Sequence, residues 1–173
     1  MRILIAVLGF LTMLPFPALA QSVQPHYRGQ GYAYFGLGTG TGNAYNTGVE
    51  QMGFGEEGFL HKGWGFGGEA GYASWGKGVL QKAWIGSADP SYHFGRHARR
   101  RGFDPFVLGG FSIFGPTQKG NGRGEPAANV GGGLNLWLGT HTALRFEARD
   151  YFNSGDYIPG HQYLSLRVGV TFR

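Results

Sequence analysis

The sequence predicts an all-β protein, a transmembrane antiparallel up-and-down β-barrel of about eight strands. Three consecutive segments near its end alternate between an apolar and a polar or glycine face. Charged residues make up only 14% of the chain, against about 25% in soluble domains. Aromatic residues reach 16%, and 34 of the 173 residues are glycine. A lipid-facing outer surface with aromatic girdles accounts for this composition.

The alternation is clearest in residues 130–138, 143–151 and 163–172. Their apolar sets are Val130, Leu134, Leu136 and Leu138, then Leu144, Phe146 and Ala148, then Leu164, Leu166, Val168, Val170 and Phe172. Successive side chains of a strand point to opposite faces. In a soluble sandwich the second face would expose glycines such as Gly131, Gly133 and Gly169 to water, where they weaken strands. The narrow lumen of an eight-stranded barrel has room for them.

The start of the chain, Met1 to Ala20, has the features of a secretory signal peptide. Arg2 precedes an apolar run from Ile3 to Leu14, and Ala18-Leu19-Ala20 forms a small-residue cleavage site. We expect cleavage before Gln21 and one barrel domain over residues 21–173. Those 153 residues (173 − 20) allow about 19 per strand and connection in an eight-stranded barrel. Because the chain has no cysteine, strand closure alone must hold the fold.

The other strands follow in order between glycine-rich and polar connections. We expect them at Gly31–Gly40, Val49–Leu60, Trp64–Tyr72, Leu80–Phe94 and Pro105–Phe114. In the second strand Glu56 and Glu57 are adjacent, so one of them must face lipid or an interface. In the fourth, Asp89-Pro90 predicts a bulge or an edge irregularity.

The connections alternate in length. Short ones are expected at His61–Gly63 and Gly139–His141, and longer ones at Gly115–Pro126 and Asn153–Gly160. Outer-membrane barrels have short periplasmic turns and longer external loops. Both ends of the domain would then lie in the periplasm.

Several runs resemble the small bacterial outer-membrane β-barrel proteins of the OmpA/OmpX-like group. They are Asn129–Trp137, Leu144–Asp150, Arg167–Phe172, Pro105–Val107 and Gly109-Gly110. The resemblance covers essentially the whole exported domain and implies a location in the bacterial outer membrane, in contact with its lipids. It also implies that the barrel-assembly machinery reads the last aromatic residue, Phe172, which Arg173 follows here.

Five charged residues fall on predicted lumen faces: Glu69, Arg145, Glu147, Arg149 and Arg167. Buried charges are costly unless they are paired. We therefore expect a Glu/Arg network that plugs the interior, because the lumen of so small a barrel is filled by side chains. The alternative is that these charges line an ion path.

The densest charge run is a predicted periplasmic turn that contains His97, Arg99, Arg100 and Arg101. Cations near an anionic membrane surface each contribute about 1 kcal/mol of attraction. The turn is therefore interpreted either as a contact for lipid phosphate or a periplasmic partner, or as a solvated turn. Export argues against a nucleic-acid partner.

No cofactor, metal or catalytic set is expected. His93 and His97 have the spacing of a helical metal pair but lie at a strand end. A hydrolase would need a serine, a histidine and an acid together. The candidate pairs, Ser91 with His93 and His161 with Ser165, have no third member at a fixed spacing.

The sequence thus favours a non-catalytic outer-membrane barrel with an envelope-structural role or a surface-interaction role, through loops that contact lipopolysaccharide or partners. Three alternatives stay open. They are a membrane-embedded lipid hydrolase or acyltransferase, a narrow channel, and a soluble periplasmic barrel that binds an apolar ligand inside.

Overall fold

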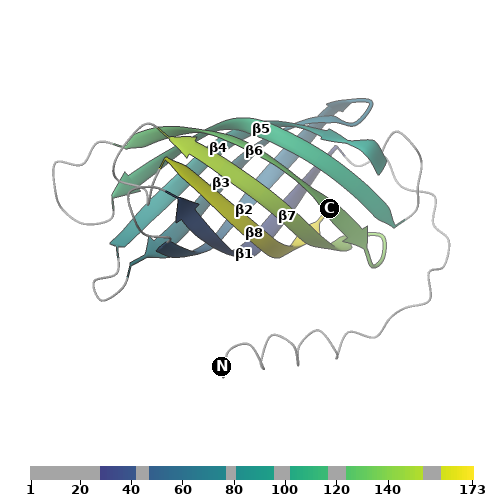
Figure 1. Cartoon of the computed structure of the whole chain (residues 1–173). Coiled ribbons are helices and arrows are strands. Elements are labelled where there is room, and N and C mark those ends of the chain that lie inside the picture. Colours follow the sequence, from purple (N-terminus) through teal and green to yellow (C-terminus); the bar gives the residue numbers. More distant parts are fainter. Residues whose placement is uncertain (1–27, 42–46, 77–80, 96–101, 117–123, 154–160) are drawn as a thin grey trace, which may run out of the picture.

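The computed structural model is a closed barrel of eight antiparallel strands (Figure 1). It describes residues 28–41, 47–76, 81–95, 102–116, 124–153 and 161–173. The strands are β1 (Gly29–Thr41), β2 (Thr47–His61), β3 (Trp64–Trp75), β4 (Gln81–His93), β5 (Phe103–Pro116), β6 (Glu125–Trp137), β7 (Thr142–Asn153) and β8 (Gln162–Phe172). Each strand pairs with its neighbours in sequence, and β1 closes the barrel against β8. The predicted fold class is confirmed.

The register fixes how wide the barrel is. A path through directly opposed residues, from Gly31 across all eight strands, returns to β1 at Thr41, ten residues further along. That displacement over eight strands corresponds to a strand tilt of about 40°. Such a barrel has an interior that side chains alone can fill.

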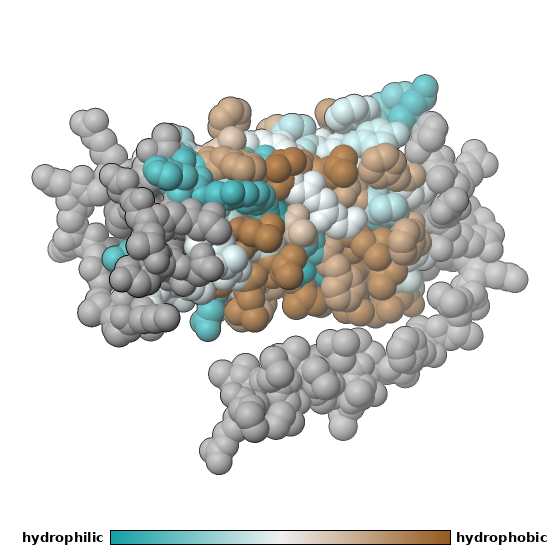
Figure 2. Space-filling model, in the orientation of Figure 1, coloured by the Kyte–Doolittle hydropathy of each residue, from teal (hydrophilic) through white to brown (hydrophobic). Residues whose placement is uncertain are grey.

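The outer wall is apolar. Large hydrophobic side chains point outward from all eight strands, among them Phe35, Phe54, Phe66, Trp84, Phe111, Val130, Phe146 and Leu166. On the face drawn in Figure 2, they cover much of the middle of the barrel, and hydrophilic residues lie mostly toward its ends. Neighbouring residues on β8 show the alternation directly, because Leu166 is 63% exposed and Ser165 is 0% exposed. The leucine faces are the outside of the barrel.

Two expectations about individual strands have different outcomes. Glu57 points into the lumen and Glu56 points outward, so one of the pair does face the surroundings. Of the two alternatives predicted at Asp89-Pro90, the bulge is wrong and an irregularity is present. Pairing of β4 with β5 is interrupted there, since Pro90 has no N–H to donate, but the register is the same on both sides. The register shift lies in β2, between Phe59 and His61.

The strands extend beyond the predicted limits at most ends. For example, β6 begins at Glu125 and β3 runs to Trp75, where residues were expected in loops. Backbone pairing continues past the point where the apolar alternation stops, so the alternation underestimates strand length.

The two ends of the barrel differ in their connections. The end where β1 begins and β8 finishes, here called the terminal end, also carries the connections β2–β3, β4–β5 and β6–β7. The tight β2–β3 turn uses positive φ angles at Lys62 and Gly63, 47° and 91°. At the opposite end, residues 42–46, 77–80, 117–123 and 154–160 lie outside the described residues. The predicted signal peptide also lies outside the described residues, as does the basic turn of His97, Arg99, Arg100 and Arg101.

Within the described segments, no helix is long and apolar enough to cross a bilayer.

Candidate functional site in the barrel lumen

The lumen is filled at three levels. The middle holds the central network, which consists of Glu69, Asp89, Arg145, Glu147, Arg149 and Arg167. The opposite end holds the apolar cluster of Val49, Ala73, Trp75, Ala83, Ile85, Phe114, Ala127, Tyr151 and Tyr163. The terminal end holds the terminal cluster of Glu57, Ser91, His93 and Asp104.

Arg149 is the hub of the central network and is 0% exposed. Its Nε donates to Glu147 Oε1 at 2.7 Å, and its Nη1 donates to Asp89 Oδ2 at 2.9 Å. Its Nη2 lies 3.4 Å from Glu69 Oε2. One guanidinium thus reaches carboxylates on β3, β4 and β7, a task for which its planar fork of donors is suited.

The remaining two arginines complete the network. Arg145 Nη2 donates to Glu147 Oε2 at 2.7 Å, and Arg167 Nη1 lies 3.0 Å from Glu69 Oε2. Three arginines therefore face three carboxylates, and the network is neutral. The five lumen residues named from the sequence lie together in it. Asp89 is the member that the sequence reading missed, because its proline neighbour suggested a bulge instead of a lumen position.

Glycines make room for these side chains. A Cβ atom on Gly53 would lie 2.6 Å from Tyr34 Oη, and one on Gly55 would lie 2.5 Å from Tyr32 Oη. Both tyrosines donate hydrogen bonds to Glu69, at 2.8 Å and 3.2 Å. The glycine face seen in the sequence is the wall against which the lumen aromatics pack.

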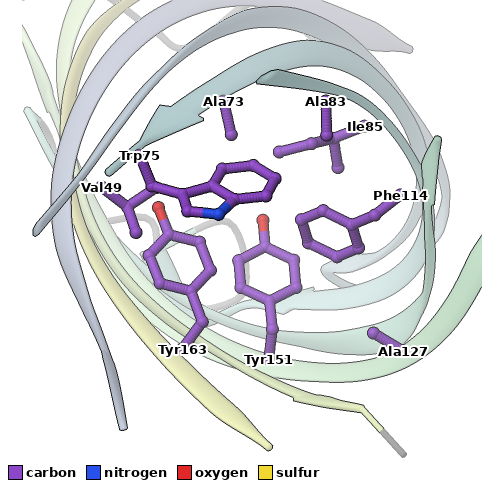
Figure 3. Packing of buried hydrophobic residues seen from close by; sticks show 9 residues of the cluster. All are labelled: Val49, Ala73, Trp75, Ala83, Ile85, Phe114, Ala127, Tyr151 and Tyr163. Atoms are coloured by element: carbon purple, nitrogen blue, oxygen red, sulfur yellow. The ribbon is translucent and has the colours of Figure 1, made fainter. Parts of the chain in front are cut away.

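The side chains of the apolar cluster point from the barrel wall into the lumen (Figure 3). The rings of Tyr151 and Tyr163 stack with centroids 5.3 Å apart, and Phe114 meets Tyr151 edge-on at 5.3 Å. Trp75 extends over the middle of the opening in the same view. The tyrosine hydroxyls bond to Gln51, which also accepts from Arg167 Nε at 3.2 Å. Gln51 therefore links the apolar cluster to the central network by hydrogen bonds.

The terminal cluster joins three strands around His93, which is 0% exposed. His93 Nδ1 lies 2.8 Å from Asp104 Oδ2, and its Nε2 lies 3.0 Å from Glu57 Oε1. Ser91 Oγ donates to the same Glu57 oxygen. None of these side chains was expected in a lumen cluster, although Ser91 and His93 were considered as a catalytic pair.

The two candidate catalytic pairs do not form serine–histidine contacts. The Ser91 hydroxyl and the His93 ring each bond to Glu57, which lies between them. Ser165 is buried and donates to Gln51, whereas His161 is exposed at the opposite end. Among the residues that the structure describes, no group of three or more acidic and histidine side chains is arranged to hold a metal ion.

The last residues close the terminal end of β8. Phe172 is half-exposed on the outer wall, opposite Gly31 on β1 and Thr142 on β7. The Arg173 amide donates to the His141 carbonyl at 3.0 Å, and its guanidinium lies 3.9 Å above the Trp137 ring. Arg173 is thus an ordered continuation of the barrel and leaves Phe172 on the outer face.

Comparison with solved structures identifies the architecture. Neisserial surface protein A (NspA) superposes with a TM-score of 0.66 at 11% identity, over 83% of this chain and 96% of that one. OprG from Pseudomonas aeruginosa gives 0.59 at 10% identity, over 87% and 98%. Ail, the attachment invasion locus protein of Yersinia pestis, gives 0.54 at 11% identity, over 84% and 97%.

The fold is that of the small outer-membrane β-barrels. The resemblance read from the sequence is thereby confirmed at the level of the fold. No protein-family model matches the chain, and no curated protein matches it in sequence. At identities of 10–11%, the small outer-membrane β-barrels share their architecture with this chain, and its role has to be argued from its own residues.

Proposed function

We propose that this protein is a non-catalytic integral protein of the bacterial outer membrane, with a barrel that conducts neither ions nor solutes. It would contribute to the envelope through its lipid-facing wall and through connections that contact lipopolysaccharide or partners. The observation that carries the proposal is the filling of the lumen at three levels. An apolar cluster, a neutral ion network and a buried histidine cluster occupy it in succession.

The channel alternative would need a continuous polar path. The central network offers charges, but every arginine in it is held by at least one carboxylate within 3.4 Å. An ion that moved past would also have to cross the apolar cluster, where partial dehydration is costly. We therefore interpret the network as a structural plug.

The enzyme alternative rests on Ser91 and His93. A serine nucleophile needs a base that takes its proton and space for a substrate carbon about 3 Å away. Glu57 occupies the position between hydroxyl and imidazole, and all three side chains are at least 95% buried. This favours a structural role for the terminal cluster.

The test is reconstitution of the refolded protein into planar bilayers and into vesicles that contain lipopolysaccharide. We expect no stepwise conductance and no release of fatty acid from the vesicle lipids. A general porin and a lipid hydrolase, each prepared in the same way, serve as positive controls. Discrete current steps would favour the channel, and fatty-acid release that Ser91→Ala abolishes would favour the enzyme.

A further inference from the structure

His93 has an acceptor at each of its two ring nitrogens. Asp104 Oδ2 faces Nδ1 at 2.8 Å, and the two oxygens of Glu57 face Nε2 at 3.0 and 3.2 Å. A carboxylate only accepts hydrogen bonds, and a neutral imidazole has a single N–H. Only the doubly protonated ring can donate to both carboxylates at once.

The other neighbours of Glu57 are hydrogen-bond donors, as an ionised carboxylate requires. Glu57 also accepts from Gln30 Nε2 at 2.8 Å and from the Ser91 hydroxyl. These donors from β1 and β4 match the acceptor oxygens of an ionised carboxylate. The two carboxylates thus offer one acceptor to each ring N–H of the imidazolium.

The remaining surroundings of the ring are aromatic. Phe106 stacks on the imidazole at 5.2 Å and Phe59 meets it edge-on at 5.0 Å. The Arg145 guanidinium on β7 also lies over the Phe106 ring, 4.0 Å from its centroid. Among the residues that the structure describes, Glu57 and Asp104 are the charged groups that touch the His93 ring, and Arg145 lies over the Phe106 ring that stacks on it.

We propose that His93 is an imidazolium that clamps β2 to β5 at the terminal end of the lumen, and that this end loosens when the proton is lost. The clamp bridges strands that are not neighbours, since β3 and β4 lie between them on the wall. Loss of one proton removes one of the two donors and leaves a carboxylate beside a lone pair. The terminal end is thereby a proton-sensitive lock, present at low pH and released as the pH rises.

The first test reads the protonation state directly. The protein is labelled with ¹⁵N, refolded in detergent micelles, and its histidine ring nitrogens are followed by long-range ¹H–¹⁵N correlation from pH 5.5 to 9. An ordinary histidine has a pKa of about 6.5, so N-acetylhistidine amide in the same micelles serves as the reference. At pH 7.5 we expect imidazolium shifts at both His93 nitrogens and neutral shifts at the reference. A neutral tautomer of His93 at pH 7.5 would overturn the proposal.

The second test measures the consequence. The folded fraction of the wild type and of His93→Gln is followed in urea at pH 6 and pH 9. We expect the folding equilibrium constant of the wild type to fall about tenfold over this range, and that of the variant to change less than twofold. Ser91→Ala, which keeps both carboxylates on the ring, should retain the wild-type dependence. Equal pH dependence in wild type and His93→Gln would contradict the lock. If His93→Gln does not fold, the titration of the wild type decides.

Discussion

Substitution of Arg149 by methionine tests the central network most sharply. Methionine keeps much of the arginine stem and removes the guanidinium, so the change is mainly one of charge. Glu147 would still be held by Arg145 and Arg167, at 2.7 and 3.2 Å, and Glu69 would keep Arg167 at 3.0 Å. Within the described part of the chain, the hydrogen-bond partner left to Asp89 would be the Asn129 amide, at 2.7 Å. The unpaired charge is therefore localised at Asp89.

An ionised carboxylate left without its partner in a buried site costs about 3–5 kcal/mol. We expect Arg149→Met to lower the free energy of unfolding by that amount. The added change Asp89→Asn removes the stranded charge and leaves an amide that can still bond to Asn129. The double variant should therefore be about 2 kcal/mol more stable than Arg149→Met alone, since replacement of both members of a buried pair is far less costly than removal of one.

The assay is urea unfolding of the protein refolded in lipid bilayers, with the folded fraction read from the mobility of unboiled samples on gels. Ala148→Leu is the matched control. It changes the neighbouring position on β7, which is exposed on the outer wall, and should stay within about 0.5 kcal/mol of wild type. The reasoning is refuted if Arg149→Met costs less than about 1 kcal/mol, or if Asp89→Asn makes it worse.

Three further outcomes are expected. Gly71→Val should fold poorly, because its Cβ would lie 2.7 Å from Tyr34 Oη and 2.9 Å from a backbone oxygen. The control is Gly68→Ala, whose Cβ would have nothing within 4 Å and which should give the refolding yield of the wild type. Trp75→Ala should lower the free energy of unfolding by about 3–5 kcal/mol, measured in urea, and leave the bilayer conductance at zero because the central network remains. Phe172→Ala should reduce the amount of protein in the outer membrane of expressing cells while refolding in vitro stays normal; equal losses in both would contradict a role as an assembly signal.

The sequence was most informative where one local rule decides the structure. The alternation of Leu164, Leu166 and Val168 with polar neighbours predicted the strand and its two faces. The low charge content and the glycines of the second face then indicated that the leucine face is the outer one. The same period placed Arg145, Glu147 and Arg149 on one face without any knowledge of their partners. Fold class and lumen face could be read from the chain in this way.

Partners across the lumen could not be read in this way. Asp104 meets His93 from the next strand, and Glu57 meets it from a strand two places away, at a separation of 36 residues. These contacts depend on the ten-residue displacement around the barrel, which no local pattern encodes. Asp89 was missed for a related reason, because a proline beside it on the outer face carried the stronger local signal.

The measurement that tests the account most directly is a site-directed spin-label scan of β8 in lipid vesicles. The chain has no cysteine, so Leu164→Cys, Ser165→Cys, Leu166→Cys and Val168→Cys each introduce a unique label site. The account predicts that labels at 164, 166 and 168 collide readily with oxygen and poorly with a water-soluble nickel chelate, while the label at 165 is shielded from both. Labels at 164, 166 and 168 that collide freely with the chelate would contradict a membrane-embedded wall.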